Sequence, residues 1–167
     1  MDISNEIRIL LWAAAPIVEL RYAVPYGILK LEVPWLTTYC FAIIGNMLPV
    51  IPILLFLKPV SERLRKFYLW DKFFKWLFDR ARRKGALVEK YEALGLALFV
   101  AIPLPVTGAW TGSIVASLFK IRLRYAFFSI LLGVAIAGLI MTILSISGKI
   151  AYENSVPWIL KLFNKSP

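Results

Sequence analysis

Two residues of opposite charge, Glu19 and Arg21, lie within an otherwise uncharged and mostly apolar segment, residues 9–29. A carboxylate can exchange a proton or bind a cation, whereas a guanidinium binds phosphate or carboxylate groups through paired hydrogen bonds. If this segment lies in a membrane, each charge costs about 3 kcal/mol or more near the bilayer centre, so a role in binding or proton transfer is the first hypothesis. The alternative is a buried ion pair that only stabilises the local fold.

A second segment with polar groups among apolar residues is 103–112, with the sequence PLPVTGAWTG. Pro103 and Pro105 disfavour helical dihedral angles in the residues before them, so a helix through this segment should be broken. The break frees backbone groups, and Thr107 and Trp110 add a hydroxyl and an indole N–H. Broken helices in transporters bind charged substrate groups in this way. The substrate-binding residues predicted from the two segments are Arg21, Pro103, Pro105, Thr107, Gly108 and Trp110.

Glu19 is the one carboxyl group within the apolar segments, and the chain contains no histidine. A proton carried at mid-depth would therefore have to bind Glu19, which is the predicted proton-coupling residue. Burial disfavours the charged carboxylate while Arg21 favours it, and the sequence leaves this balance open. Because Cys40 is the single cysteine, a disulfide within the chain is excluded. Because the chain also lacks histidine, a zinc site and a Ser-His-Asp triad are excluded as well. We expect no metal, no cofactor and no enzymatic catalysis.

The composition indicates a membrane protein. Hydrophobic residues make up 60% of the 167 residues, and the mean hydropathy is +0.73. A helix of about 20 apolar residues crosses the hydrocarbon core of a bilayer. Three uncharged runs reach that length, at residues 33–57, 93–119 and 125–148. We therefore expect an all-α integral membrane protein with a single domain over residues 1–167.

The positions of the prolines predict how these runs are arranged. Pro16 and Pro25 interrupt the apolar segment 9–29, and Pro103 and Pro105 interrupt the segment 93–119. Because interior prolines remove helical hydrogen bonds, each interrupted segment is expected to form a re-entrant helical hairpin rather than a full span. An apolar segment follows each hairpin, so the pattern of hairpin plus transmembrane helix occurs twice. The predicted elements are hairpins at 7–31 and 93–119 and transmembrane helices at 33–57 and 122–148.

The distribution of basic residues predicts the topology. Eleven Lys and Arg residues lie between Lys58 and Lys90, and three more lie at Lys120, Arg122 and Arg124. Positive charge concentrates on the cytoplasmic side of membrane proteins, so both groups should be cytoplasmic. This requires the second hairpin to be re-entrant, and it makes the two halves an inverted repeat. The prediction is a cell-membrane protein with residues 58–92 in the cytoplasm and both termini outside.

Residues 61–85 are predicted to form a basic, amphipathic helix at the membrane surface. Apolar residues recur there every three or four positions, and Lys and Arg occupy the other face. Ser61 is the expected N-cap. The net charge of +10 would suit nucleic acid in a soluble protein, but the aromatic face favours membrane lipids of an anionic leaflet. A shorter amphipathic segment is expected at 150–164.

The two interrupted segments resemble the signatures of a known family. Residues 16–27, PIVELRYAVPYG, and residues 103–112 are similar to the two motifs of the small multidrug export proteins. That family is similar in architecture to the DedA (VTT-domain) superfamily, whose members have paired re-entrant hairpins and include lipid scramblases and flippases of polyprenyl-phosphate carriers. The resemblance implies a membrane transporter with its site between two hairpins.

Three functions remain open at this point. Transport of a phosphate-bearing lipid, such as a polyprenyl-phosphate carrier, is favoured because Arg21 suits an anionic head group. Efflux of small cationic drugs would use Glu19 as the binding residue. A scaffold that transports nothing would use both hairpins only for packing, to which the small residues Gly108, Gly112 and Ala116 are suited. Association into a homo-oligomer is compatible with each of them.

Overall fold

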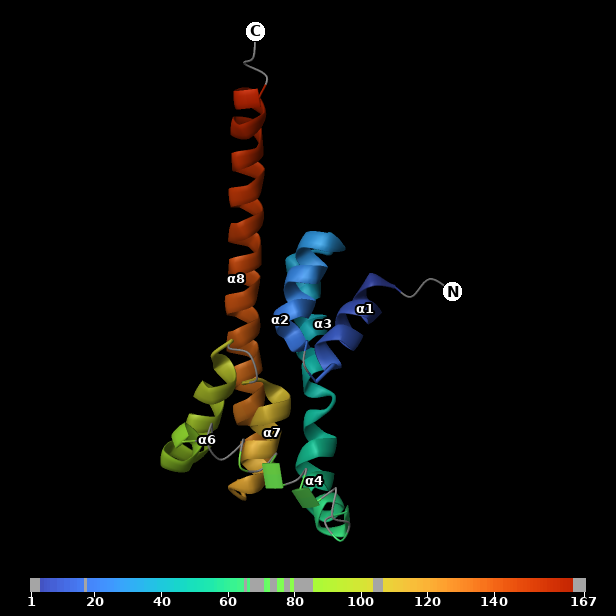
Figure 1. Ribbon diagram of the computed structural model, residues 1–167, viewed down its shortest axis with the longest axis vertical. Helices are drawn as coiled ribbons and strands as arrows, with labels where there is room; N and C mark the ends of the chain where they lie inside the picture. The colour runs from blue at the N-terminus through green and yellow to red at the C-terminus, as the bar shows by residue number, and fades with distance from the viewer. Residues whose placement is uncertain are drawn as a thin grey trace.

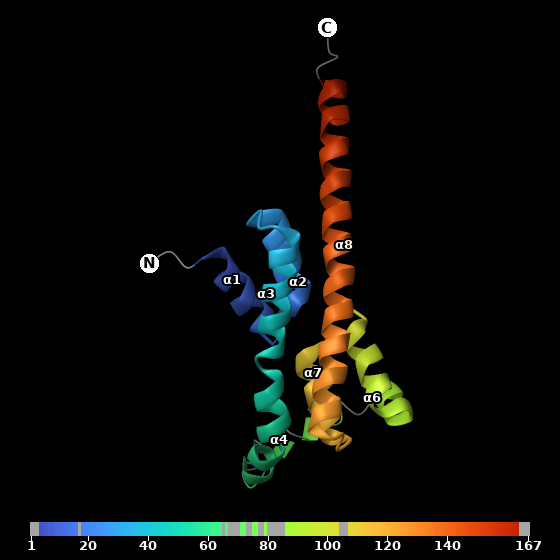
Figure 2. The same cartoon turned by 180° about the vertical axis from the view of Figure 1, so that it is seen from behind.

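The fold is known from a computed structural model that describes residues 4–16, 18–64, 66, 71–72, 75–76, 79, 86–103 and 107–163. Over this part of the chain the regular elements are helices without strands, which confirms the predicted all-α class. Figures 1 and 2 show them from opposite sides. The elements are α1 (Asn5–Ala14), α2 (Glu19–Pro25), the π-helix η1 (Tyr26–Lys30), α3 (Trp35–Met47), α4 (Val50–Leu64), α6 (Ala86–Ala101), α7 (Ala109–Leu118) and α8 (Leu123–Phe163).

Two stretches are long and apolar enough to cross a membrane, namely Trp35–Leu57 and Leu123–Ala151. They run in opposite directions, α3 and α4 downward and α8 upward in Figure 1. Their outer faces carry exposed large apolar side chains, among them Ile44, Phe56, Phe128 and Leu144. A surface of this kind is typical of a protein that contacts lipid rather than water.

Two pairs of shorter helices lie beside the long ones. In Figure 1, α1 descends to the middle of the molecule and α2 returns upward, while α6 ascends to the middle and α7 returns downward. Ala15 has extended dihedral angles before Pro16, which ends α1. Helix α1 packs on α3 and α6 packs on α8, and α2 contacts α8 while α7 contacts α4. The two helix turns therefore meet at the same level.

Equivalent features occur in both halves of the chain. Glycine allows close helix crossing in each half, because a Cβ on Gly45 would collide with the Leu10 carbonyl oxygen of α1, and one on Gly133 would lie 2.7 Å from the Ala97 carbonyl oxygen of α6. The residue two positions after the short return helix has a positive φ in each half, 54° at Glu32 and 55° at Lys120. The next amide then donates back into the helix, from Val33 to Gly27 and from Ile121 to Ala116, both at 3.0 Å.

The structure corrects three expected boundaries. The predicted transmembrane helix at 33–57 is divided, because a turn at Leu48 and Pro49 separates α3 from α4. Pro49 has no backbone N–H to donate to the helix. Ser61 is not an N-cap, since α4 continues through Pro59 to Leu64. The segment 150–164 is not a separate element, because α8 continues without a break to Phe163.

Most of the predicted surface helix at 61–85 lies outside the described residues. The described positions include the ion pair between Lys75 and Asp71, whose Nζ and Oδ2 atoms are 2.6 Å apart. The spacing of four residues is that of neighbours on a helix face.

Candidate functional site

Glu19 and Arg21 lie where the chain turns from α1 into α2. Glu19 is the first residue of α2 and is 3% exposed. Its backbone has a φ of 51°, an uncommon value for a residue with a side chain. Such dihedral angles persist where the surrounding structure holds them, often at functional positions. The Arg21 Nη1 atom is 3.8 Å from Glu19 Oε2, so the two charges form a loose ion pair.

The Glu19 carboxylate contacts the start of α7. The backbone N–H of Trp110, the second residue of α7, donates to Glu19 Oε1 at 3.4 Å. Gly108 lies against the same carboxyl group, and a Cβ at this position would overlap all three of its terminal atoms. The positive end of the α7 dipole favours the charged carboxylate. Gly108 is therefore required for contact between Glu19 and α7.

Arg21 contacts the residue before Gly108 through its guanidinium group. Its Nη2 atom donates to Thr107 Oγ1 at 3.4 Å, and the Thr107 hydroxyl donates to the Ile102 carbonyl oxygen at 2.9 Å. The Arg21 side chain is 17% exposed, compared with 4% for Glu19. Arg21 is thus the member of the pair that an external ligand can contact.

The structure brings together most of the residues predicted for the site. Glu19, Arg21, Thr107, Gly108 and Trp110 form one cluster across about 90 positions of sequence. Helix α6 ends at Ala101, and the exposed Ile102 separates that end from Pro103. Pro105 lies outside the described residues.

The Trp110 indole has a role that the sequence did not indicate. Its Nε1–H donates to the Ala14 carbonyl oxygen at 3.1 Å. Ala14 is the last residue of α1, and its carbonyl is one of the groups that a helix end leaves without an internal partner. In this conformation the indole joins the two turns, and a substrate would have to displace Ala14 to use the same donor.

A cluster of three aromatic rings beside the charged pair was also missed. Trp12 and Tyr22 have ring centroids 5.3 Å apart, and Tyr22 and Tyr26 stack at 5.3 Å with an interplanar angle of 17°. Trp12 and Tyr22 are 41% and 46% exposed. The spacing of four between Tyr22 and Tyr26 could have predicted their stacking, but the contact with Trp12 depends on the turn between α1 and α2.

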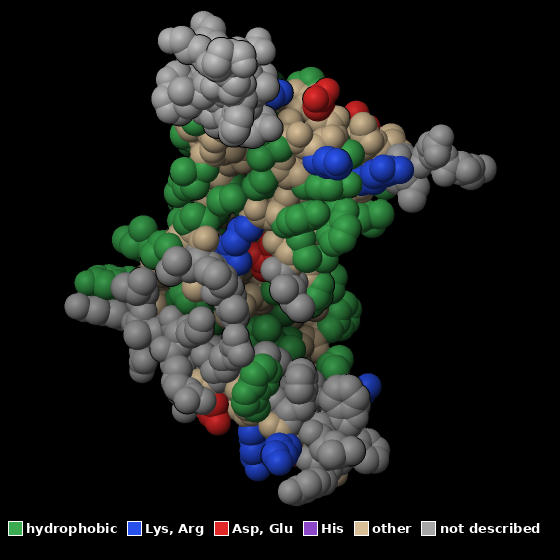
Figure 3. All heavy atoms as spheres, turned by 45° about the horizontal axis from the view of Figure 1, so that its top comes forward, with side chains coloured by type: hydrophobic (Ala, Val, Ile, Leu, Met, Phe, Trp, Pro, Cys, Tyr) green, Lys and Arg blue, Asp and Glu red, His purple; other side chains and the backbone are tan. Residues whose placement is uncertain are grey.

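Among the described residues, the salt bridges that involve Glu19 or Arg21 join these two residues to each other. In Figure 3, Lys, Arg, Asp and Glu side chains gather toward the ends, and one blue and one red group lie together in a hollow between them. No cluster of three or more metal-ligating side chains occurs within the described residues. A guanidinium such as that of Arg21 can bind a charged group, and a carboxylate such as that of Glu19 can supply or accept a proton.

Comparison with known families shows what the chain is similar to. A family model described as "Putative small multi-drug export protein" matches residues 19–140, which begin at Glu19 and include all of α7. Comparisons with curated proteins and with solved structures gave no match. The family match, the two long apolar helices and the export name indicate a membrane location and a transporter rather than an enzyme. Because the match spans well over half of the chain, this protein belongs to the small multidrug export protein family.

Proposed function

We propose that the protein moves an amphipathic substrate with a phosphate-bearing head group through a mid-membrane site between two re-entrant hairpins. The observation that carries this proposal is the unequal exposure of the charged pair, because Arg21 is 17% exposed while Glu19 is almost completely covered. A guanidinium binds phosphate through charge-assisted, bidentate hydrogen bonds. A polyprenyl-phosphate carrier combines such a head with an apolar tail that suits the exposed apolar surface.

The proposed architecture is an inverted repeat like that of DedA proteins. The support comes from the paired glycine contacts at Gly45 and Gly133 and the paired positive-φ residues Glu32 and Lys120. Each short helix pair also begins and ends at the same end of the molecule, α1 and α2 toward the top of Figure 1 and α6 and α7 toward the bottom. In a bilayer, each pair would then enter and leave on the same side, and the site would lie near the midplane.

The same proposal sets the topology, with the central basic segment in the cytoplasm and both termini outside. We expect a cysteine at Lys75 to react with a membrane-impermeant maleimide only after the cells are opened. A cysteine at Lys30, the last residue of η1, should react in intact cells, since the proposed topology puts this end of the first hairpin outside. The background would be a Cys40→Ala variant, because Cys40 is an exposed free thiol. Labelling of position 75 in intact cells contradicts the topology.

Proton coupling is assigned to Glu19 in this proposal. Its carboxylate is held by the Trp110 amide and faces Arg21, so a bound phosphate that attracts Arg21 would weaken one of its two partners. The loss of a positive neighbour favours protonation of a carboxylate. Substrate binding and proton uptake would thereby be linked.

Efflux of lipophilic cations is the second candidate, and the aromatic cluster favours it. Trp12, Tyr22 and Tyr26 offer ring faces that attract cations, and Tyr22 follows Arg21 directly in sequence. In that case Glu19 would leave the Trp110 amide to bind the drug, and Arg21 would only stabilise the fold.

A comparison of two ligands tests the proposal. Purified protein in nanodiscs would be titrated with a polyprenyl phosphate and with a lipophilic aromatic cation, with the uncharged polyprenol as the matched control. We expect saturable binding of the phosphate and at least roughly tenfold weaker binding of the alcohol, because one charge-assisted contact is worth about 1.5 kcal/mol or more. Preference for the cation would establish the second candidate, and binding of neither ligand would favour the scaffold.

A further inference from the structure

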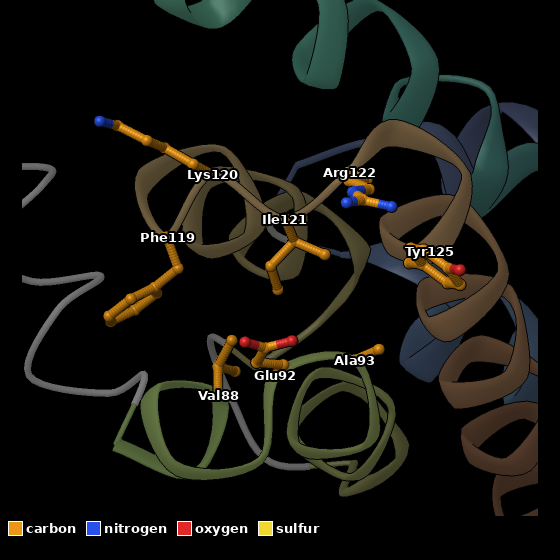
Figure 4. A pocket seen from close by; sticks show the side chains of 8 residues that line it. All are labelled: Val88, Glu92, Ala93, Phe119, Lys120, Ile121, Arg122 and Tyr125. Atoms are coloured by element: carbon orange, nitrogen blue, oxygen red, sulfur yellow. The ribbon is translucent and has the colours of Figure 1, made fainter.

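A cavity of about 620 Å³ has neither member of the charged pair among its lining residues. It is formed between the first part of α6 and the loop that joins α7 to α8 (Figure 4). The charged side chains around it are Glu92, Lys120 and Arg122, and Val88, Phe119 and Ile121 supply much of its apolar wall. A cavity of this size is typical of a small-ligand site.

The charges of opposite sign face one cavity without neutralising each other. Glu92 and Arg122 form no ion pair with any residue in the part of the chain that the structure describes. In Figure 4 the Glu92 carboxylate points from α6 toward Ile121. Arg122 and Tyr125 lie on the α8 side of the cavity, and Lys120 extends outward. A purely anionic ligand would meet the Glu92 carboxylate, and a purely cationic one would meet Arg122. A ligand with both charges can satisfy both residues.

The backbone holds Glu92 in an unusual conformation. Its φ of 45° and ψ of −117° are not helical, and they form a kink within α6. Dihedral angles of this kind are costly for a residue with a side chain, and they cluster at ligand sites. The kink sets Glu92 at the border between the polar start of α6 and its apolar part, Tyr91–Ala101.

The level of the cavity points to a lipid. Arg122 directly precedes the apolar stretch Leu123–Ala151, and Glu92 lies at the start of Tyr91–Ala101, so both charges lie where the apolar surface begins. This border corresponds to the head-group region of a bilayer. Exposed apolar side chains continue from it along α6 and α8, including Leu94, Leu98, Phe128 and Leu132.

We propose that this cavity binds the phosphoethanolamine head group of a membrane lipid, with the ammonium on Glu92 and the phosphate on Arg122. A primary ammonium donates hydrogen bonds to a carboxylate, which the quaternary ammonium of phosphatidylcholine cannot do. The apolar wall contacts the glycerol region, so the lipid binds better than its free head group. The site is separate from Glu19 and Arg21, and it exists whether or not the mid-depth site transports a substrate.

The test measures which lipids remain bound to the protein. Protein extracted from vesicles that contain equal amounts of phosphatidylethanolamine, phosphatidylcholine and phosphatidylglycerol would be examined by native mass spectrometry. We expect enrichment of phosphatidylethanolamine over both other lipids. Glu92→Gln should reduce its advantage over phosphatidylcholine roughly tenfold, and Arg122→Gln should reduce retention of phosphatidylethanolamine and phosphatidylglycerol alike.

Two matched variants serve as controls. Glu32→Gln changes another carboxylate at a positive φ, but one that does not line the cavity, and Arg124→Gln removes a neighbouring charge that does not line it either. Both should retain the wild-type lipid preference. Free phosphoethanolamine at the same concentration should not displace the lipid, and if it does, the lipid is not the ligand.

The proposal is overturned by equal retention of the three lipids, by enrichment of phosphatidylglycerol, or by an unchanged Glu92→Gln variant. If a Gln variant does not fold, the preference of the wild-type protein among the three lipids still decides the question.

Discussion

Gly108→Ala is expected to abolish transport through the mid-depth site while the protein remains folded. A Cβ at this position would occupy the space of the Glu19 carboxyl group, which must then rotate away from the Trp110 amide. The carboxylate would lose a hydrogen bond to a charged group and face a new apolar neighbour, at a cost of about 1.5–3 kcal/mol. Substrate transport into liposomes and the thermal unfolding temperature would be measured together.

Gly112→Ala is the matched control for this prediction. Its Cβ would lie 2.6 Å from the Val100 Cγ2 atom, so it introduces a steric conflict one turn further along α7 without a conflict at Glu19. It should lower stability while transport per folded molecule changes little. Gly148→Ala, where nothing lies within 4 Å of the added Cβ, should be neutral for both measurements. Normal transport by Gly108→Ala would show that contact between Glu19 and α7 is not needed.

Arg21→Ala is expected to eliminate binding of a phosphate-bearing lipid and to destabilise the protein. It removes the phosphate ligand and leaves the buried Glu19 carboxylate without its positive neighbour. Breaking a buried ion pair from one side costs about 3–5 kcal/mol, so unfolding must be followed alongside binding. Arg21→Lys should keep most of the stability but bind the phosphate weakly, because an ammonium cannot form the bidentate contact.

Glu19→Gln separates the two substrate classes. For a phosphate lipid, this variant should still bind and should lose the pH dependence of transport, since the exchangeable proton is gone. For a cationic drug it should lose binding, while an Arg21 variant that folds should retain it. Arg8→Ala, which removes an exposed positive charge from α1, controls for the change in net charge in the Arg21→Ala variant. Binding of the phosphate lipid by a folded Arg21→Ala variant would reject the preferred substrate class.

Local signals were sufficient to predict the class of the protein and the candidate residues. Hydropathy and helix length depend on neighbouring residues alone, and they predicted the two long apolar helices that the structure contains. Proline acts on its own residue and the one before it, so the end of α1 near Pro16 was also predictable. The cost of an intramembrane charge singled out Glu19 and Arg21 before any contact was known.

Local signals were insufficient where a proline or a charge competes with its surroundings. Pro59 does not end α4 although Pro49 separates it from α3, and Lys149 does not end α8. A helix continues through a proline such as Pro59 when the hydrogen bonds on both sides compensate for the one that is lost. Lys149 keeps its backbone N–H, so its charge alone does not end α8.

Tertiary structure alone decided which groups meet at the site. The contact of Glu19 with Gly108 and the Trp110 amide joins residues about 90 positions apart, and no periodicity in the sequence specifies it. Periodicity in the sequence does not specify the hydrogen bond from the Trp110 indole to Ala14 either, or the placing of Glu92 and Arg122 on one cavity. These contacts depend on how closely α1 and α6 cross the long helices, which the small volumes of Gly45 and Gly133 permit. A sequence displays such glycines but not their partners, because helix packing is a property of two surfaces and hydropathy describes only one.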